Sequence, residues 1–145
     1  YRVPAIGQPF DVGYGGVITL LGYDLTDPVA AAGGPLRLTL YWRADARMET
    51  PYTVFVHLID AQNRLWGQRD SQPLDGSYPT TAWLPGEVVI DEIELSVQPD
   101  APAGSYQLAV GLYDGATGQR LNAQDTENTP LNENRALLGP VQVTR

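Results

Sequence analysis

Residues 101–114 constrain the fold more than any other part of the chain. Large apolar side chains occupy every second position from Tyr106 to Leu112, the period of a strand with one face turned to a core. Pro102 and Gly104 precede them and turn the chain through a corner. A tyrosine placed two residues after that glycine can donate a hydrogen bond to the corner's backbone, as in the tyrosine corner of β-sandwiches. The sequence therefore predicts a strand, a crossover between two sheets and a central strand over 97–114.

Other segments repeat the alternation of a strand. The clearest is 36–44, where apolar and polar residues alternate and Trp42 belongs to the inward set. No segment has a sustained helical period, so the sequence predicts an all-β fold. We expect an antiparallel β-sandwich of seven to nine strands, immunoglobulin-like or jelly-roll-like. The remaining predicted strands are 17–25, 52–60, 64–70, 88–97 and 137–143.

Three segments depart from regular alternation. Residues 1–16 are rich in glycine and proline and predict a linker or N-terminal arm, which leaves 17–145 as a single domain. Residues 71–87 have no period but keep large apolar side chains, as one long structured loop does. Between Ile90 and Ile93 the apolar parity changes, which predicts a β-bulge near Asp91.

Charge and composition exclude several classes of function. The formal net charge is −8, and an acidic domain repels phosphate backbones, so nucleic acid is not an expected partner. No apolar run approaches the about 20 residues of a membrane span, so we expect no direct membrane insertion by this segment. With no cysteine and one histidine, neither a cysteine-based nor a histidine-rich metal site is possible, and no cofactor is expected. The chain begins at Tyr1 and its only methionine is Met48, which favours a piece of a longer protein.

No catalytic residue is predicted. The serines have no G-x-S-x-G surroundings, which argues against a nucleophilic hydrolase. The acidic segment 87–94 is similar to the E-x-D-x-x-E strand of some β-sandwich glycosidases, and Asp91 and Glu94 fit its second half. Val89 stands where the first glutamate is needed, so a small glycosidase-like hydrolase is only the second alternative. Glu92 and Glu94 are interpreted as a solvated face.

Aromatic residues in and beside the long loop are candidate ligand-binding residues. Trp66, Tyr78 and Trp83 present flat apolar faces with polar tips, which suit a pyranose ring. The competing interpretation is that Tyr78 and Trp83 close the open end of the sandwich. Calcium is a weaker option, since the aspartate pairs 24 with 27 and 70 with 75 lack EF-hand spacing.

The remaining candidates are polar. His57 lies in a predicted strand, Asp70 closes the next one, and Asp91 sits at the expected bulge. We hypothesise that the 71–87 loop folds back and brings Asp70 or Asp91 within hydrogen-bonding reach of His57 under Trp83. Such a cluster is either a polar pin that fastens the loop or the floor of a binding cleft.

Several short motifs between Leu21 and Leu121 occur together in this chain. They are Leu-Gly-Tyr at 21–23, Leu-Tyr-Trp-Arg at 40–43, Phe-Val-His-Leu at 55–58, Asp-Ser-Gln-Pro at 70–73, the segment 78–87 and Gly-Leu-Tyr-Asp at 111–114. With them the chain resembles the C-terminal β-sandwich domain of bacterial multi-spanning membrane glycosyltransferases of the dolichyl-phosphate-mannose mannosyltransferase type. The resemblance implies a non-catalytic, extracytoplasmic accessory domain, tethered by a membrane-spanning part outside this segment and binding glycan or a protein partner. The alternative is a purely structural spacer without a ligand.

Overall fold

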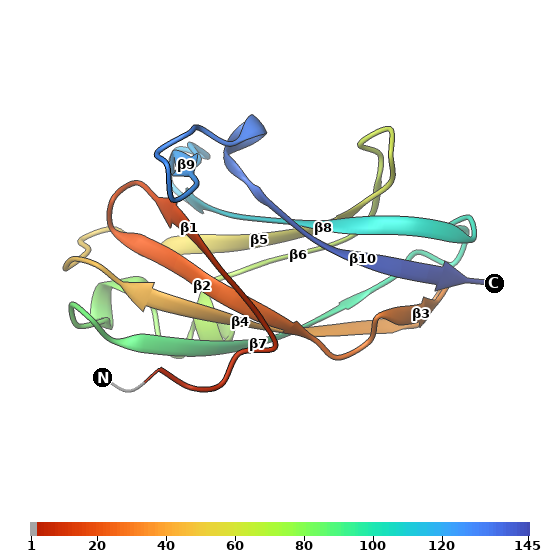
Figure 1. The fold of residues 1–145 in the computed structure, drawn as a ribbon, viewed down its shortest axis with the longest axis horizontal. Helices are drawn as coiled ribbons and strands as arrows, with labels where there is room; N and C mark the ends of the chain where they lie inside the picture. The colour runs from red at the N-terminus through yellow and green to blue at the C-terminus, as the bar shows by residue number, and fades with distance from the viewer. Residues whose placement is uncertain (1–2) are drawn as a thin grey trace.

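A computed structural model describes residues 3–145 and shows two five-stranded sheets packed face to face (Figure 1). The first sheet has the strand order β7-β4-β2-β1-β9 and the second β3-β10-β8-β5-β6. Neighbouring strands are antiparallel except β3 and β10, which are parallel. The all-β sandwich is therefore confirmed. The strands are β1 (Gln8–Tyr14), β2 (Ile18–Leu25), β3 (Val29–Ala31), β4 (Pro35–Ala44), β5 (Tyr52–Ile59), β6 (Leu65–Ser71), β7 (Val88–Ser96), β8 (Gly104–Asp114), β9 (Ala123–Gln124) and β10 (Ala136–Thr144).

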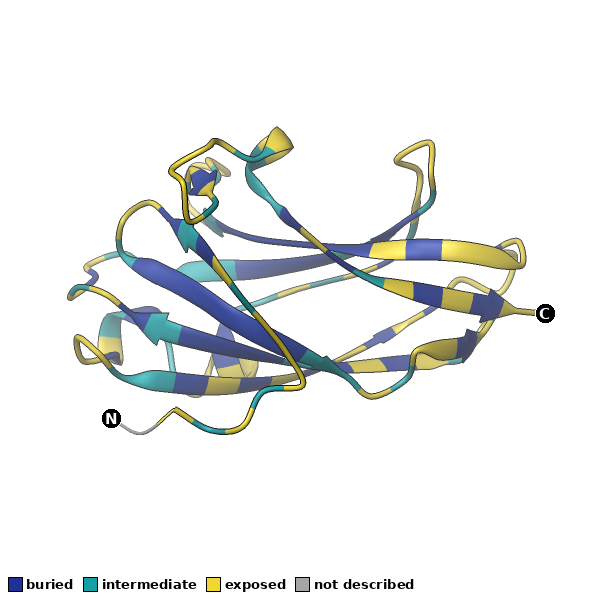
Figure 2. Cartoon of the chain, viewed as in Figure 1, coloured by how far each residue is buried: buried dark blue, intermediate teal, exposed yellow. Residues whose placement is uncertain are grey.

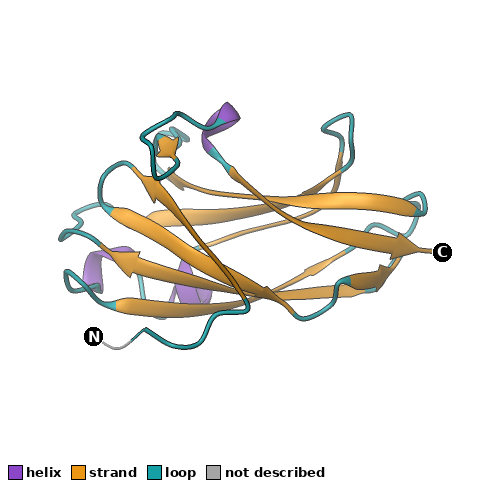
Figure 3. Cartoon of the chain, viewed as in Figure 1, coloured by secondary structure: helices purple, strands orange, loops and turns teal. Residues whose placement is uncertain are grey.

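In the described part of the chain, helical structure is limited to short 3₁₀ turns between the strands (Figure 3). Two of them, Pro73–Gly76 and Thr80–Ala82, lie in the predicted 71–87 loop, and the third is Asn132–Asn134. Within residues 3–145, no helix has the length and apolar character needed to cross a membrane. The 71–87 loop packs back on the body as expected, since Trp83 within it is fully buried.

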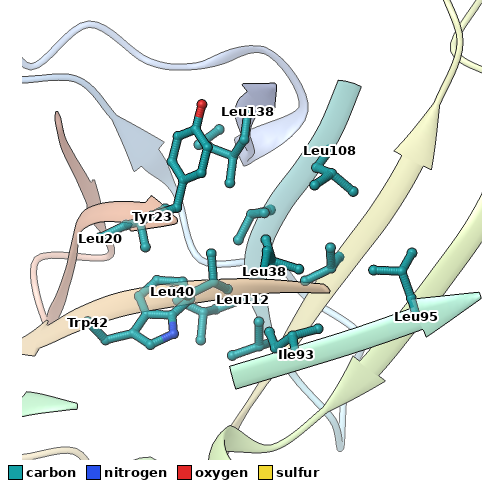
Figure 4. Close-up of a cluster of buried hydrophobic side chains, with 14 of the residues drawn as sticks. Leu20, Tyr23, Leu38, Leu40, Trp42, Ile93, Leu95, Leu108, Leu112 and Leu138 are labelled. Atoms are coloured by element: carbon teal, nitrogen blue, oxygen red, sulfur yellow. The ribbon is translucent and has the colours of Figure 1, made fainter. Parts of the chain in front are cut away.

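The core lies between the sheets and consists mainly of inward residues of the strands, while β6 contributes only the partly buried Trp66 (Figure 2). On β4 the buried positions include Leu38, Leu40 and Trp42, which is the parity that the sequence predicts. On β8 they include Leu108 and Leu112, which face β4 across the sandwich (Figure 4). Alternation thus placed the core correctly on β4 and β8.

The corner before β8 also forms as predicted. β7 belongs to the first sheet and β8 is the middle strand of the second, so the chain crosses between the sheets at this point. The Tyr106 hydroxyl donates a hydrogen bond of 2.6 Å to the Pro102 carbonyl. This contact confirms the tyrosine corner.

The N-terminal segment is more ordered than the sequence indicates. The prediction of a linker over 1–16 is wrong for Gln8–Tyr14, which form β1 between β2 and β9, while residues 1–2 lie outside the described part. Tyr14 is fully buried, and its hydroxyl donates a 2.7 Å hydrogen bond to the Val110 carbonyl of the opposite sheet. Its ring also packs edge-on against Trp42, with 5.7 Å between the centroids. Because glycines surround Tyr14, the composition of this segment predicts a linker and not a strand.

The predicted bulge in β7 is wrong. β7 pairs with β4 from Val88 to Ser96 without a shift in register. Val89, Asp91 and Ile93 share the inward face, and Ile90 points outward with 43% of its surface exposed. The apolar pattern changes because an aspartate occupies an inward position and an isoleucine an outward one.

Candidate functional site

His57 and Asp70 come together as hypothesised, on the outer face of the second sheet. His57 Nε2 lies 3.5 Å from Asp70 Oδ1, and the Tyr113 hydroxyl donates a 2.9 Å hydrogen bond to Asp70 Oδ2. Burial lowers the pKa of His57, and the Asp70 carboxylate opposes that shift. Burial thus favours the uncharged imidazole in this pair, whose two side chains stand on the neighbouring strands β5 and β6.

Asp91 and Trp83 do not join that pair, so the hypothesis of one cluster is wrong. Asp91 faces inward from the first sheet, whereas His57 faces outward from the second, and the backbone of the second sheet separates them. Trp83 is in the core, where its indole N–H donates a 3.0 Å hydrogen bond to the Tyr78 carbonyl. The long loop is fastened by Asp91 instead, whose Oδ1 accepts a 3.1 Å hydrogen bond from the Leu74 amide.

The candidate aromatic residues do not form a shared platform. Tyr78 stacks on Trp83 with 6.5 Å between the ring centroids, and its hydroxyl donates to Glu87 at 2.7 Å. Trp66 instead donates its indole N–H to Asp60 at 2.9 Å, just beyond the far end of β5. The loop that carries Tyr78 lies at the other end of β5, since the Thr80 hydroxyl accepts a hydrogen bond from the amide of Tyr52, the first residue of that strand. The two aromatic groups are therefore near opposite ends of an eight-residue strand, which is about 23 Å long. Trp66 and Tyr78 cannot contact one sugar ring together.

The four aspartates considered for calcium are engaged in separate contacts. Asp24 accepts hydrogen bonds from the Gly7 amide and the Tyr41 hydroxyl, and Asp27 is paired with Arg37. Asp70 faces His57, and Asp75 is paired with Arg69. In the described part of the chain, no three His, Asp or Glu side chains gather as metal ligands.

A polar groove of about 460 Å³ lies on the outer face of the first sheet, at a place where the sequence indicated only a solvated surface. Its floor is made by outward residues of β4 and β7, among which Thr39 pairs with Glu92 and Arg37 with Glu94 across the strands. Arg69 and Asp75, from the edge of the second sheet and the loop that follows it, form one wall. The lining residues are Thr26, Arg37, Leu38, Thr39, Arg69, Asp75, Glu92, Ile93 and Glu94.

Ion pairs order the charged side chains at the edges of this groove. Arg37 binds Asp27 through two hydrogen bonds, Nε to Oδ2 at 2.9 Å and Nη2 to Oδ1 at 3.1 Å, and these bonds lower the pKa of Asp27. Arg69 is paired with Asp75, and its Nη1 also donates to the Glu94 carbonyl at 3.2 Å. Each guanidinium is thus held in place by a partner.

Glu92 and Glu94 give the groove an acidic floor. Both side chains are exposed and lie on the same outward face of β7. Together with Asp75 they bring three carboxylates to a lining that contains two guanidinium groups, Arg37 and Arg69. The groove therefore offers hydroxyl, guanidinium and carboxylate groups for hydrogen bonding, with an excess of negative charge. Asp91 points to the opposite face of β7 from Glu94, so the two cannot act on one substrate as a glycosidase pair.

Comparison with known proteins supports the fold. The sequence matches no protein-family profile and no curated protein. The solved structures similar to it include the C-terminal domain of Wzt, with a TM-score of 0.60 and 13% identity over 95% of this chain and 80% of that one. Two others are a Niemann-Pick type C2 protein from the Japanese carpenter ant (TM-score 0.49, 6% identity, 99% and 100% covered) and a Pyrococcus furiosus CARDB domain in complex with di-metal ions (TM-score 0.45, 13% identity, 99% and 97% covered). This chain thus has the β-sandwich fold of the Wzt C-terminal domain.

Proposed function

We propose that this chain is a non-catalytic module that binds a glycan in the groove on the outer face of its first sheet. The observation that carries the proposal is the groove itself, about 460 Å³ in volume and lined by side chains that hydrogen-bond well to sugar hydroxyls. Small-molecule sites typically have volumes of about 300–1,000 Å³, so the groove is large enough for a sugar unit.

The geometry of the groove favours recognition by hydrogen bonds. Thr39, Arg37 and Glu92 stand on two paired strands, so their positions are fixed by the sheet. Carboxylates and guanidinium groups make charge-assisted hydrogen bonds, which are stronger than those between neutral groups. The lining contains no aromatic ring, so stacking contributes nothing there and the affinity comes from polar contacts alone.

The proposed cellular context rests on the resemblance of the sequence motifs. We propose that the module lies outside the cytoplasm, as an accessory domain of a membrane glycosyltransferase whose chemistry resides in another part. In this setting the module holds a glycan near the enzyme. A protein ligand at the same groove and a spacer without any ligand are the competing outcomes of the test below.

A glycan array followed by calorimetry tests the proposal. The labelled 145-residue chain is applied to the array, and the strongest oligosaccharide is titrated against the wild type and the Glu92→Gln variant. Losing one charged hydrogen bond of about 1.5–3 kcal/mol weakens binding by about 10- to 150-fold. Glu127→Gln, which changes an exposed carboxylate in the loop before β10, is the matched control and should bind like the wild type.

The outcomes separate the competing functions. A glycan whose affinity depends on Glu92 but not on Glu127 supports the proposal. A glycan that binds both variants equally well shows that the site lies elsewhere. An array without any signal, repeated at millimolar glycan by calorimetry, refutes glycan binding and leaves a protein ligand or a spacer without a ligand as the function.

A further inference from the structure

The turn that walls the groove has an unusual backbone. Leu74, Asp75 and Gly76 are consecutive residues with positive φ, of 55°, 56° and 82°. Glycine adopts this left-handed region freely, but leucine and aspartate do so at a steric cost. Leu74 is also 37% exposed, so burial of its side chain does not fully account for the conformation. Contacts to the rest of the protein must hold the turn.

Asp91 makes one of these contacts, with the first residue of the turn. Asp91 is only 4% exposed as a residue and lies on the inward face of β7, where its carboxyl accepts the hydrogen bond of the Leu74 amide. Within the turn, the Ser77 amide and hydroxyl both donate hydrogen bonds to the Leu74 carbonyl, at 3.0 and 2.6 Å. Asp91 therefore fixes the residue at which the left-handed run begins.

The same turn carries one member of an ion pair that lines the groove. Asp75 follows Leu74 directly and forms the ion pair with Arg69, and both residues line the groove. Arg69 in turn donates to the Glu94 carbonyl on the floor strand. A continuous set of contacts thus runs from buried Asp91 through the turn to the groove wall.

An aspartate interrupts the apolar inward face of β7, where its neighbours are Val89 and Ile93. A buried polar group costs free energy unless polar partners surround it. Asp91 has two such partners, the Leu74 amide and the buried Trp42 indole N–H, which lies near enough to lower the pKa of the carboxyl. Of these two partners, only the Leu74 amide belongs to the left-handed turn.

We propose that Asp91 is a positioning residue, which holds the left-handed turn at Leu74 and thereby sets Asp75 and Arg69 as the wall of the groove. The inference deepens the proposed function, because the wall matters for ligand binding only if the groove is the glycan site. The hold on the turn itself is independent of any ligand.

Amide hydrogen exchange measured by NMR on the 145-residue chain tests the inference. In Asp91→Leu we expect the Leu74 amide to exchange about tenfold faster or more, while the strand amides of β7 keep their rates relative to one another. Asp91→Asn keeps an acceptor oxygen and should retain most of the protection. Asp100→Leu, at an exposed aspartate in the crossover to β8, is the matched control and should leave the Leu74 rate unchanged.

Three results overturn the inference. The first is a Leu74 exchange rate that is the same in Asp91→Leu and the wild type. The second is faster exchange throughout β7, and the third is an Asp91→Leu chain that does not fold, since in both cases Asp91 serves the whole sandwich. Exchange needs no glycan, so an array without signal refutes the proposed function and leaves this result standing. If a glycan does bind, its affinity should fall in Asp91→Leu and be largely kept in Asp91→Asn.

Discussion

Tyr14→Phe tests whether the N-terminal strand is part of the core. The substitution keeps the ring and its edge-on contact with Trp42 and removes only the hydroxyl that donates to the Val110 carbonyl at 2.7 Å. Both residues are fully buried, so water cannot replace the lost bond. A hydrogen bond of this kind contributes about 1 kcal/mol, and a buried carbonyl left without it adds a desolvation cost, so we expect unfolding to become easier by about 1–3 kcal/mol.

This magnitude predicts a measurable thermal shift. For 145 residues the unfolding entropy is about 0.3 kcal/mol per kelvin, so the midpoint should fall by about 3–10 °C. Differential scanning calorimetry and urea titration of the wild type and Tyr14→Phe measure the change. Burial also raises the pKa of Tyr14, so the phenol remains a donor and the difference should not vary between pH 5 and 9. Equal midpoints in both proteins would refute the argument that this bond joins the two sheets.

Three further predictions concern stability. Tyr106→Phe should cost about 1 kcal/mol, because the exposed Pro102 can exchange its lost hydrogen bond for water; identical urea midpoints would contradict a contribution from the corner. Trp42→Ala should cost about 3–5 kcal/mol by leaving a cavity in the core, and a loss below 1 kcal/mol in the same titration would argue against it. Burial raises the pKa of Asp91, so the folded state holds this proton to a higher pH than the unfolded state. The stability that protonated Asp91 contributes is complete below the unfolded pKa of about 3.9 and is lost as the pH rises through the folded pKa. Between pH 4 and 7 the Asp91→Asn variant should therefore gain stability relative to the wild type. Urea midpoints of the two proteins that run parallel over that range would contradict this prediction.

The alternation of apolar and polar residues predicted most of the strands. The inward set on β4, ending at Trp42, and the corner at Tyr106 depend on local sequence and on the period of a strand, so both could be predicted. β1 could not, because its glycines and prolines resemble a linker, and only its position between two strands buries Tyr14. The sequence predicts a bulge in β7 because Asp91 breaks the apolar inward pattern of that strand. The Leu74 amide that hydrogen-bonds to this buried aspartate is 17 positions away in the chain, so the local pattern does not show it.

The candidate site was only partly predictable. The pairing of His57 with Asp70 follows from the hairpin of β5 and β6, where the two strands are neighbours in sequence. The groove depends on β4 and β7, which are far apart in the chain, and on a wall turned inward by left-handed residues. Its floor, with Glu92 on β7, carries the ordinary pattern of a solvated face. Nothing in that pattern distinguishes a groove from a flat surface.

The arrangement of the sheet edges has a consequence for self-association. An unpaired edge strand attracts strands of other molecules and so promotes aggregation. Here the two longer edge strands, β6 and β7, lie against each other, through the Arg69 hydrogen bond to Glu94 and a 2.9 Å bond from the Gln98 amide to the Trp66 carbonyl. On the opposite side the edges are β3 and β9, which are three and two residues long. They pair only with Gly13 and Tyr14 of β1 and with Gln142–Thr144 of β10, so the rest of these two strands keeps a free edge. Any pairing with a strand of another molecule is therefore expected along β1 or β10, on the side opposite the closed β6–β7 seam.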